Sequence, residues 1–125
     1  MEKLTIREMK APDVFKLTSI ISKIGIKQFK DLFNKETLST LRDKNLSKDD
    51  KNAITLELAL GVVDILLANV EKCEEAIYRF LASLCEVDKT EIENLKGIDF
   101  FNLLIEVFTH KDFLDFFKVA LRFQK

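Results

Sequence analysis

The chain has 125 residues, of which 47% are hydrophobic and 33% charged, with three Gly and one Pro. This composition is typical of one globular domain and excludes a disordered or collagen-like chain. The formal net charge is -1, which lacks the basic excess expected of a dedicated nucleic-acid binder.

The first ten residues predict an extended arm. Leu4-Thr5-Ile6-Arg7 alternate apolar and polar side chains, as in an extended segment or one short strand. A single strand is not stable by itself, so we expect its pairing partner to come from another molecule. Leu4 and Ile6 are therefore candidate contacts to a partner.

Two helices are predicted before residue 34. The first begins at Ala11-Pro12-Asp13, because Pro is favoured in a first helical turn, and it ends at Gly25 as a C-cap. The second begins at about Ile26. Apolar positions at helical spacing are Phe15, Ile20, Ile21 and Ile24 in the first, and Phe29, Leu32 and Phe33 in the second. After a break at 34–37, a weaker helix would use Leu38, Leu41 and Leu46.

The helix predicted at about 49–69 is the most hydrophobic element, and Ser47 is its expected N-cap. Its few interruptions fall in one narrow stripe, formed by Glu57, Gly61, Asp64 and Ala68. We expect this helix to be the central and most buried one. The stripe is either its one solvent-facing edge or a seam where Gly61 lets another helix approach closely.

Four further helices are predicted, at 71–85, from Asp88 to about Leu95, from an N-cap at Asp99 through Phe108, and at 111–123. Asp88 and Glu91 resemble a capping box. The last helix has a broad apolar face that either docks into the core or forms part of an interface. Its candidate partner or oligomer contacts are Phe113, Phe116, Phe117 and Phe123.

The pattern as a whole predicts an all-α fold. We expect one compact domain over residues 1–125 with six to eight helices. Residues 1–10 would form the arm, and residues 111–125 the Phe-rich terminal helix.

No catalytic, metal or cofactor site is predicted, so we do not expect an enzyme. His110 is the only histidine, and Cys73 and Cys85 form no CxxC pair. Phosphate-binding and nucleophile motifs are missing. Lysines around Gly25 superficially resemble a helix-turn-helix, but the second helix offers only Gln28 to read bases. We therefore expect no nucleic-acid binding.

The most apolar run, Leu56 to Ala68, contains Glu57 and Asp64 and is too short to span a bilayer. The N-terminus lacks the hydrophobic region of a signal peptide. We expect a cytoplasmic protein with reduced thiols and no membrane partner.

Charge is distributed unevenly along the chain. Residues 1–52 carry 12 basic and 8 acidic groups, residues 53–109 carry 4 and 11, and residues 110–125 carry 4 and 2. Regions of opposite sign permit salt-dependent head-to-tail association or partners of either sign. The simpler interpretation is ordinary solvated helix faces.

Several segments together resemble the tail assembly chaperones of long-tailed, siphovirus-like phages and prophages of Gram-positive bacteria. The resemblance covers most of the chain. It rests on four segments: residues 4–15 (LTIREMKAPDVF), residues 20–25 (IISKIG), residues 69–84 (NVEKCEEAIYRFLASL) and residues 111–119 (KDFLDFFKV).

The resemblance implies a chaperone that binds and solubilises the tape measure protein during tail assembly, acting as a homo-oligomer. It also implies a possible contact with the tail tube protein, a location in the bacterial host cytoplasm and absence from the mature virion. The alternative is a small helical phage or prophage regulator that binds DNA or a repressor.

Overall fold

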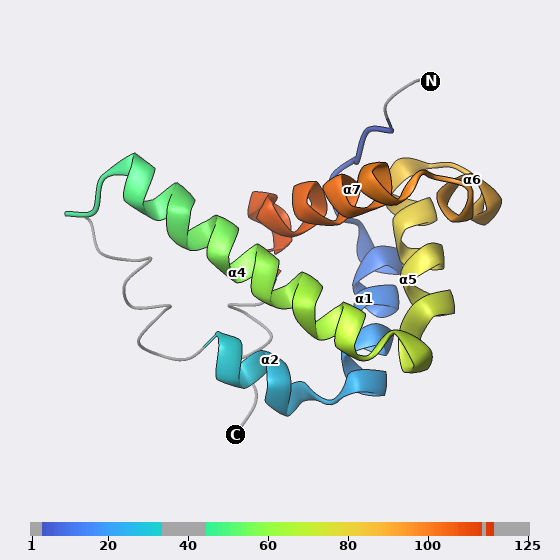
Figure 1. Cartoon of the computed structure of the whole chain (residues 1–125), viewed down its shortest axis with the longest axis horizontal. Helices are drawn as coiled ribbons and strands as arrows, with labels where there is room; N and C mark the ends of the chain where they lie inside the picture. Colours follow the sequence, from blue (N-terminus) through green and yellow to red (C-terminus); the bar gives the residue numbers. More distant parts are fainter. Residues whose placement is uncertain (1–3, 34–44, 114, 117–125) are drawn as a thin grey trace.

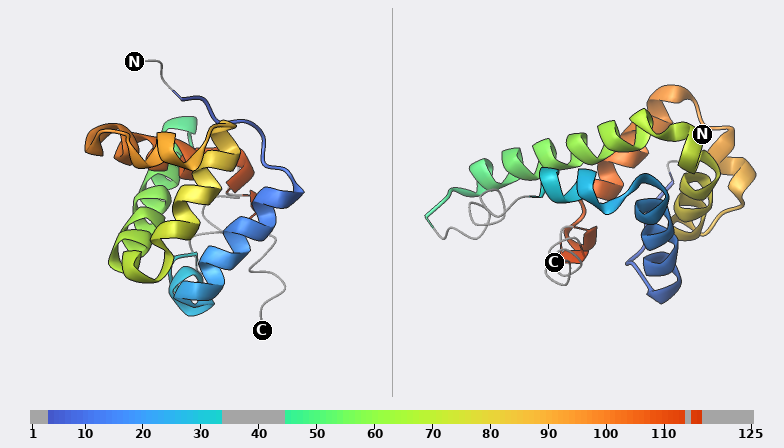
Figure 2. Two further views of the ribbon diagram at one scale, coloured as in Figure 1. Left: turned by 90° about the vertical axis from the view of Figure 1, so that its right-hand side faces the viewer. Right: turned by 90° about the horizontal axis from the view of Figure 1, so that it is seen from below.

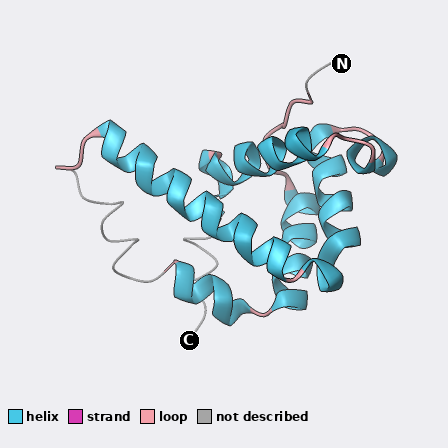
Figure 3. Cartoon of the chain, viewed as in Figure 1, coloured by secondary structure: helices cyan, strands magenta, loops and turns pink. Residues whose placement is uncertain are grey.

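The computed structural model describes residues 4–33, 45–113 and 115–116. Its helices are α1 (Ala11–Ile24), α2 (Ile26–Leu32), α4 (Lys48–Ala68), α5 (Val70–Cys85), α6 (Lys89–Glu93) and α7 (Gly97–Thr109). Residues 111–113 and 115–116 are helical as well. These ranges contain no strand (Figures 1 and 3). The predicted all-α, single-domain fold is confirmed.

Helix starts and stops follow from local chemistry. Pro12 occupies the first turn of α1, and Gly25 separates α1 from α2 with φ +108°, a value that side-chain-bearing residues rarely adopt. Ser47 precedes α4, and its Oγ accepts a 3.0 Å hydrogen bond from the backbone N–H of Asp50. The predicted ends of these three helices are confirmed.

Two predicted caps are wrong in detail. α7 begins at Gly97, with Lys96 as the residue before it, so Asp99 lies inside the first turn and is not the N-cap. At that position its carboxylate still interacts favourably with the positive end of the helix dipole. Asp88 does precede α6, but its side chain makes no capping hydrogen bond. Leu38 and Leu41 of the predicted weak helix lie outside the described residues, and Leu46 lies in a bend before α4 and not in a helix.

α5 is the central helix of the described fold. It packs against α1 on one side and α6 near its end, while α7 and α2 pack on α4. In Figure 2 (left), α5 lies between α1 and α4, and α7 crosses above them. The largest side chains with less than 2% of their surface exposed are Leu17, Ile20, Phe29, Val62, Val63, Leu66, Phe80, Leu81, Leu84, Ile92 and Leu104.

α4 is not the most buried helix, so this prediction is wrong. Its buried side is formed by Leu58, Ala59, Val62, Val63 and Leu66. The remaining leucines of α4, Leu56, Leu60 and Leu67, lie next to this buried side and are exposed. Outside its narrow stripe the helix is apolar, but the described neighbours cover only part of this apolar surface, and periodicity cannot show which part.

The stripe on α4 combines both predicted interpretations. Glu57, Asp64 and Ala68 are exposed, as expected of a solvent-facing edge. Gly61 instead faces α2, where an added Cβ would lie 2.5 Å from Leu32 Cδ1. The helix that approaches Gly61 closely is therefore α2 of the same chain.

Candidate functional site

The N-terminal arm docks on its own chain. The backbone N–H of Arg7 donates a 3.0 Å hydrogen bond to the carbonyl of Leu84, and that of Met9 donates a 3.3 Å bond to Asp112 Oδ2. Leu4 and Ile6 are half-buried and pack against the core. The expectation that the arm would need a partner from another molecule is wrong for the described residues 4–10.

A buried carboxylate joins the arm to α1 and α5. Asp13 is fully buried, and its Oδ2 lies 2.5 Å from Arg7 Nη1 and 2.8 Å from the backbone nitrogen of Lys10. Its Oδ1 accepts hydrogen bonds from Ser83 Oγ at 2.6 Å and from Arg7 Nη2 at 3.2 Å. The sequence showed Asp13 only as part of a helix start, because Ser83 lies 70 residues away.

These contacts keep Asp13 ionised. Burial by itself raises the pKa of the carboxyl group, but the bonds from Arg7, Ser83 and the Lys10 N–H outweigh it and lower the pKa below its usual value. The hydrogen bond with Asp13 in turn raises the pKa of Arg7. The network is a satisfied ion pair of the kind that fixes the position of a segment.

The candidate phenylalanines differ in their surroundings. Phe113 has 2% of its surface exposed and makes edge-to-face contacts with Phe80 at 5.6 Å and Phe108 at 5.3 Å between ring centroids. Phe116 is half-buried against the core. Phe113 is thus a core residue, whereas Phe117 and Phe123 lie outside the described residues.

An open groove of about 480 Å³ lies between the arm and the terminal segment. It is lined by Glu8, Met9, Asp112, Asp115 and Phe116. The groove brings Phe116 next to the arm, as part of the surface that the sequence singled out. Its three carboxylates make it acidic.

The most extensive exposed apolar row of one described element lies on α4. Leu56, Leu60 and Leu67 have 44%, 44% and 48% of their surfaces exposed. These positions recur at helical spacing and therefore lie on one side of the helix. We call these three residues the α4 outer face. The sequence did not single them out, because α4 is apolar nearly all round.

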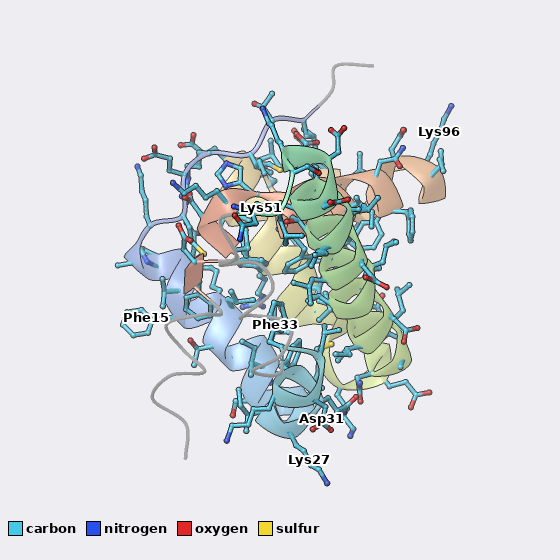
Figure 4. The ribbon with its side chains drawn as sticks, turned by 90° about the vertical axis from the view of Figure 1, so that its left-hand side faces the viewer. Phe15, Lys27, Asp31, Phe33, Lys51 and Lys96 are labelled. Carbon is cyan, nitrogen blue, oxygen red and sulfur yellow. The ribbon has the colours of Figure 1, made fainter. Side chains whose placement is uncertain are left out.

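Two further apolar side chains are exposed elsewhere. Phe15 is 74% exposed, whereas Ile20, Ile21 and Ile24, the other apolar positions singled out in this helix, are buried. It projects from α1 into solvent (Figure 4). Ile98, at the start of α7, is 65% exposed. Single exposed apolar residues are common on protein surfaces and by themselves indicate no site.

The titratable groups do not form a reactive cluster among the described residues. Burial raises the pKa of the Cys73 thiol, and burial together with Glu106 raises the pKa of Cys85 to about 11, so neither is an activated nucleophile. His110 follows α7, and its Nδ1 accepts a 3.2 Å hydrogen bond from the backbone N–H of Asp112, in a capping role. No described group of His, Cys, Asp and Glu is arranged to hold a metal ion.

The exposed carboxylates on α5 form surface contacts. Glu75 pairs with Lys89 and with Arg79, and the hydrogen bond from Lys89 lowers the pKa of Glu75. Tyr78 Oη donates a 2.8 Å hydrogen bond to Glu74. These groups belong to solvated helix faces, as the sequence predicted.

The region around Gly25 presents few side chains that could contact DNA bases. α2 has seven residues, and both Phe29 within it and Phe33 directly after it are buried. Gln28, the one residue suited to reading bases, accepts a 3.4 Å hydrogen bond from Asn69 Nδ2.

Within the described part of the chain, no helix combines the length and apolar character needed to cross a membrane. Comparison with protein-family models, curated proteins and solved structures finds no match to this chain.

Proposed function

We propose that this protein is a phage tail assembly chaperone that binds the tape measure protein and keeps it soluble while the tail is built. The observation that carries the proposal is the α4 outer face, where Leu56, Leu60 and Leu67 are each close to half exposed. A chaperone for a hydrophobic client needs apolar surface that remains accessible after it has folded.

The sequence resemblance supplies the identity of the client. Residues 69–84, which carry part of that resemblance, form most of α5, and residues 4–15 form the arm and the start of α1. The proposal includes a homo-oligomer, contact with the tail tube protein, a place in the cytoplasm of the bacterial host and absence from the mature virion.

Co-expression with the tape measure gene from the same phage or prophage tests the proposal. We expect the tape measure protein to move from the insoluble to the soluble fraction and to be retained with the tagged chaperone. An unrelated small helical protein expressed at the same level serves as the control. Tape measure protein that stays insoluble, and is not retained, contradicts the proposed function.

The alternative, a phage regulator that binds DNA or a repressor, has one supporting feature. Lys23 and Lys27 are exposed on either side of Gly25. Phosphate contacts would make DNA binding fall steeply with salt concentration. Retardation of phage operator DNA at low salt, lost at higher salt, would support the regulator; no retardation at low salt removes the DNA-binding form of it.

A further inference from the structure

The α4 outer face has a shape suited to a helical partner. Leu56, Leu60 and Leu67 lie within about 40° of one another around the axis, at 100° per residue. Leu56 and Leu67 are separated by about 16 Å along the helix. A straight row of this length matches about three turns of a second helix, packed with its ridges between the leucines.

The residues that flank the row are acidic. Asp49, Asp50, Glu57 and Asp64 are all exposed and lie within about 80° of Leu60 around the axis. Lys51 lies nine residues before Leu60, which places it on the opposite side of α4. None of the four carboxylates forms an ion pair with a described residue, so their charges are available to a partner.

We propose that the α4 outer face binds an amphipathic helix of a partner protein whose apolar side is flanked by Lys or Arg. Such a helix covers the three leucines and places cations beside the acidic residues. A second copy of this chain docking by its own α4 would bring two acidic flanks together, which is unfavourable. The inference deepens the proposed function, because the helix would belong to the client.

Binding of a synthetic peptide tests the inference directly. The probe is an amphipathic helix of about 18 residues, or five turns, with Leu on one side and Lys on the other. The reference peptide carries Glu in place of Lys. Fluorescence anisotropy with labelled peptides should show the Lys peptide binding about tenfold more tightly at low salt. This difference should shrink as salt screens the charges.

Substitutions in the protein locate the binding site. Leu60→Ser should weaken binding of the Lys peptide about tenfold. The free energy gained by burying a leucine side chain on binding corresponds to a tenfold change in affinity or more. Ile98→Ser removes an even more exposed apolar residue elsewhere and should leave the affinity unchanged. Leu67→Ser provides a second test should Leu60→Ser lower the melting temperature.

The charges are tested by reversing their sign. Glu57→Lys combined with Asp64→Lys should weaken binding of the Lys peptide and strengthen binding of the Glu peptide, each by about threefold or more. Glu91→Lys, on the exposed surface of α6, is the control and should change neither affinity by more than a small, nonspecific amount. Equal effects of the control and the α4 substitutions would overturn the inference.

Three further outcomes decide between the proposals. If the Leu60→Ser variant binds the Lys peptide with the affinity of the unchanged protein, the inference is wrong. It is also wrong if the substitution makes an oligomer dissociate while the affinity for the peptide stays the same. If Leu60→Ser still solubilises the tape measure protein fully, the inference is wrong while the proposed function stands. If the peptide binds α4 as expected but the tape measure protein remains insoluble, the proposed function is wrong and the binding face stands.

Discussion

At the scale of single residues, Asp13 is the most constrained charged side chain in the described fold. It is fully buried, yet four donors from the arm, the start of α1 and α5 surround it. Removing the charge leaves Arg7 close to an apolar interior without its counter-ion. A network of this kind is costly to break because every member depends on the others.

Asp13→Asn should therefore lower the free energy of unfolding by roughly 2–4 kcal/mol, which is less than for a fully buried ion pair because the Arg7 side chain is 20% exposed. Urea denaturation followed by circular dichroism measures the change. Asp88→Asn is the matched control, because Asp88 is exposed and its side chain caps nothing; it should cost less than about 0.5 kcal/mol. Equal losses for the two variants would contradict a structural role for the Asp13 network.

The same group predicts how stability responds to acid. The pKa of Asp13 is lower in the folded protein than in the unfolded chain, so its ionised form favours folding. This contribution is fully present above the unfolded pKa, near 4, and it is lost as the pH falls through the folded value. Urea titrations from pH 7 to pH 3 should show a smaller loss of stability in Asp13→Asn than in the unchanged protein. Parallel pH profiles would contradict this assignment.

At the scale of elements, the close contact between α2 and α4 depends on the missing side chain of Gly61. Leu32 occupies the space that a Cβ would need. Gly61→Leu should destabilise the fold by roughly 1–3 kcal/mol through overpacking. Combining it with Leu32→Ala should cost less than the sum of the two single changes, because the second change vacates the space. Strict additivity in denaturation experiments would show that the two helices do not meet as described.

The terminal segment contains both a core residue and a half-buried one, and their substitutions should differ. Phe113→Ala removes a ring enclosed by Phe80 and Phe108 and should cost about 3–5 kcal/mol. Phe116→Ala, beside the open groove, should cost clearly less. Thermal denaturation of the two variants compares them. A larger loss for Phe116→Ala would contradict their relative burial.

At the scale of the whole molecule, the proposed chaperone should self-associate. Light scattering over a range of concentrations should show oligomers larger than a dimer, in keeping with the proposed coating of a long client. The uneven charge along the chain should make this association sensitive to salt. A strict monomer at high concentration would contradict the oligomeric part of the proposal.

Much of the fold could be predicted from the sequence because local signals mark the element ends. Pro12, Gly25 and Ser47 define boundaries through backbone chemistry that needs no distant contact. The Asp13 network could not be predicted, since it needs Ser83 brought close by tertiary packing. The exposure of Leu56, Leu60 and Leu67 could not be predicted either, because outside its narrow polar stripe α4 is apolar, and its sequence pattern does not show which apolar residues the neighbouring helices cover.

The docked arm has a consequence for the order in which the protein folds during synthesis. Arg7 leaves the ribosome early, but its hydrogen-bonding partner Ser83 lies 76 residues later, and the partner of Met9 lies 103 residues later. The arm can take its final position only when most of the chain has been made. Since contacts across long stretches of chain form slowly, closure of the arm should be a late step, after the helices between have assembled.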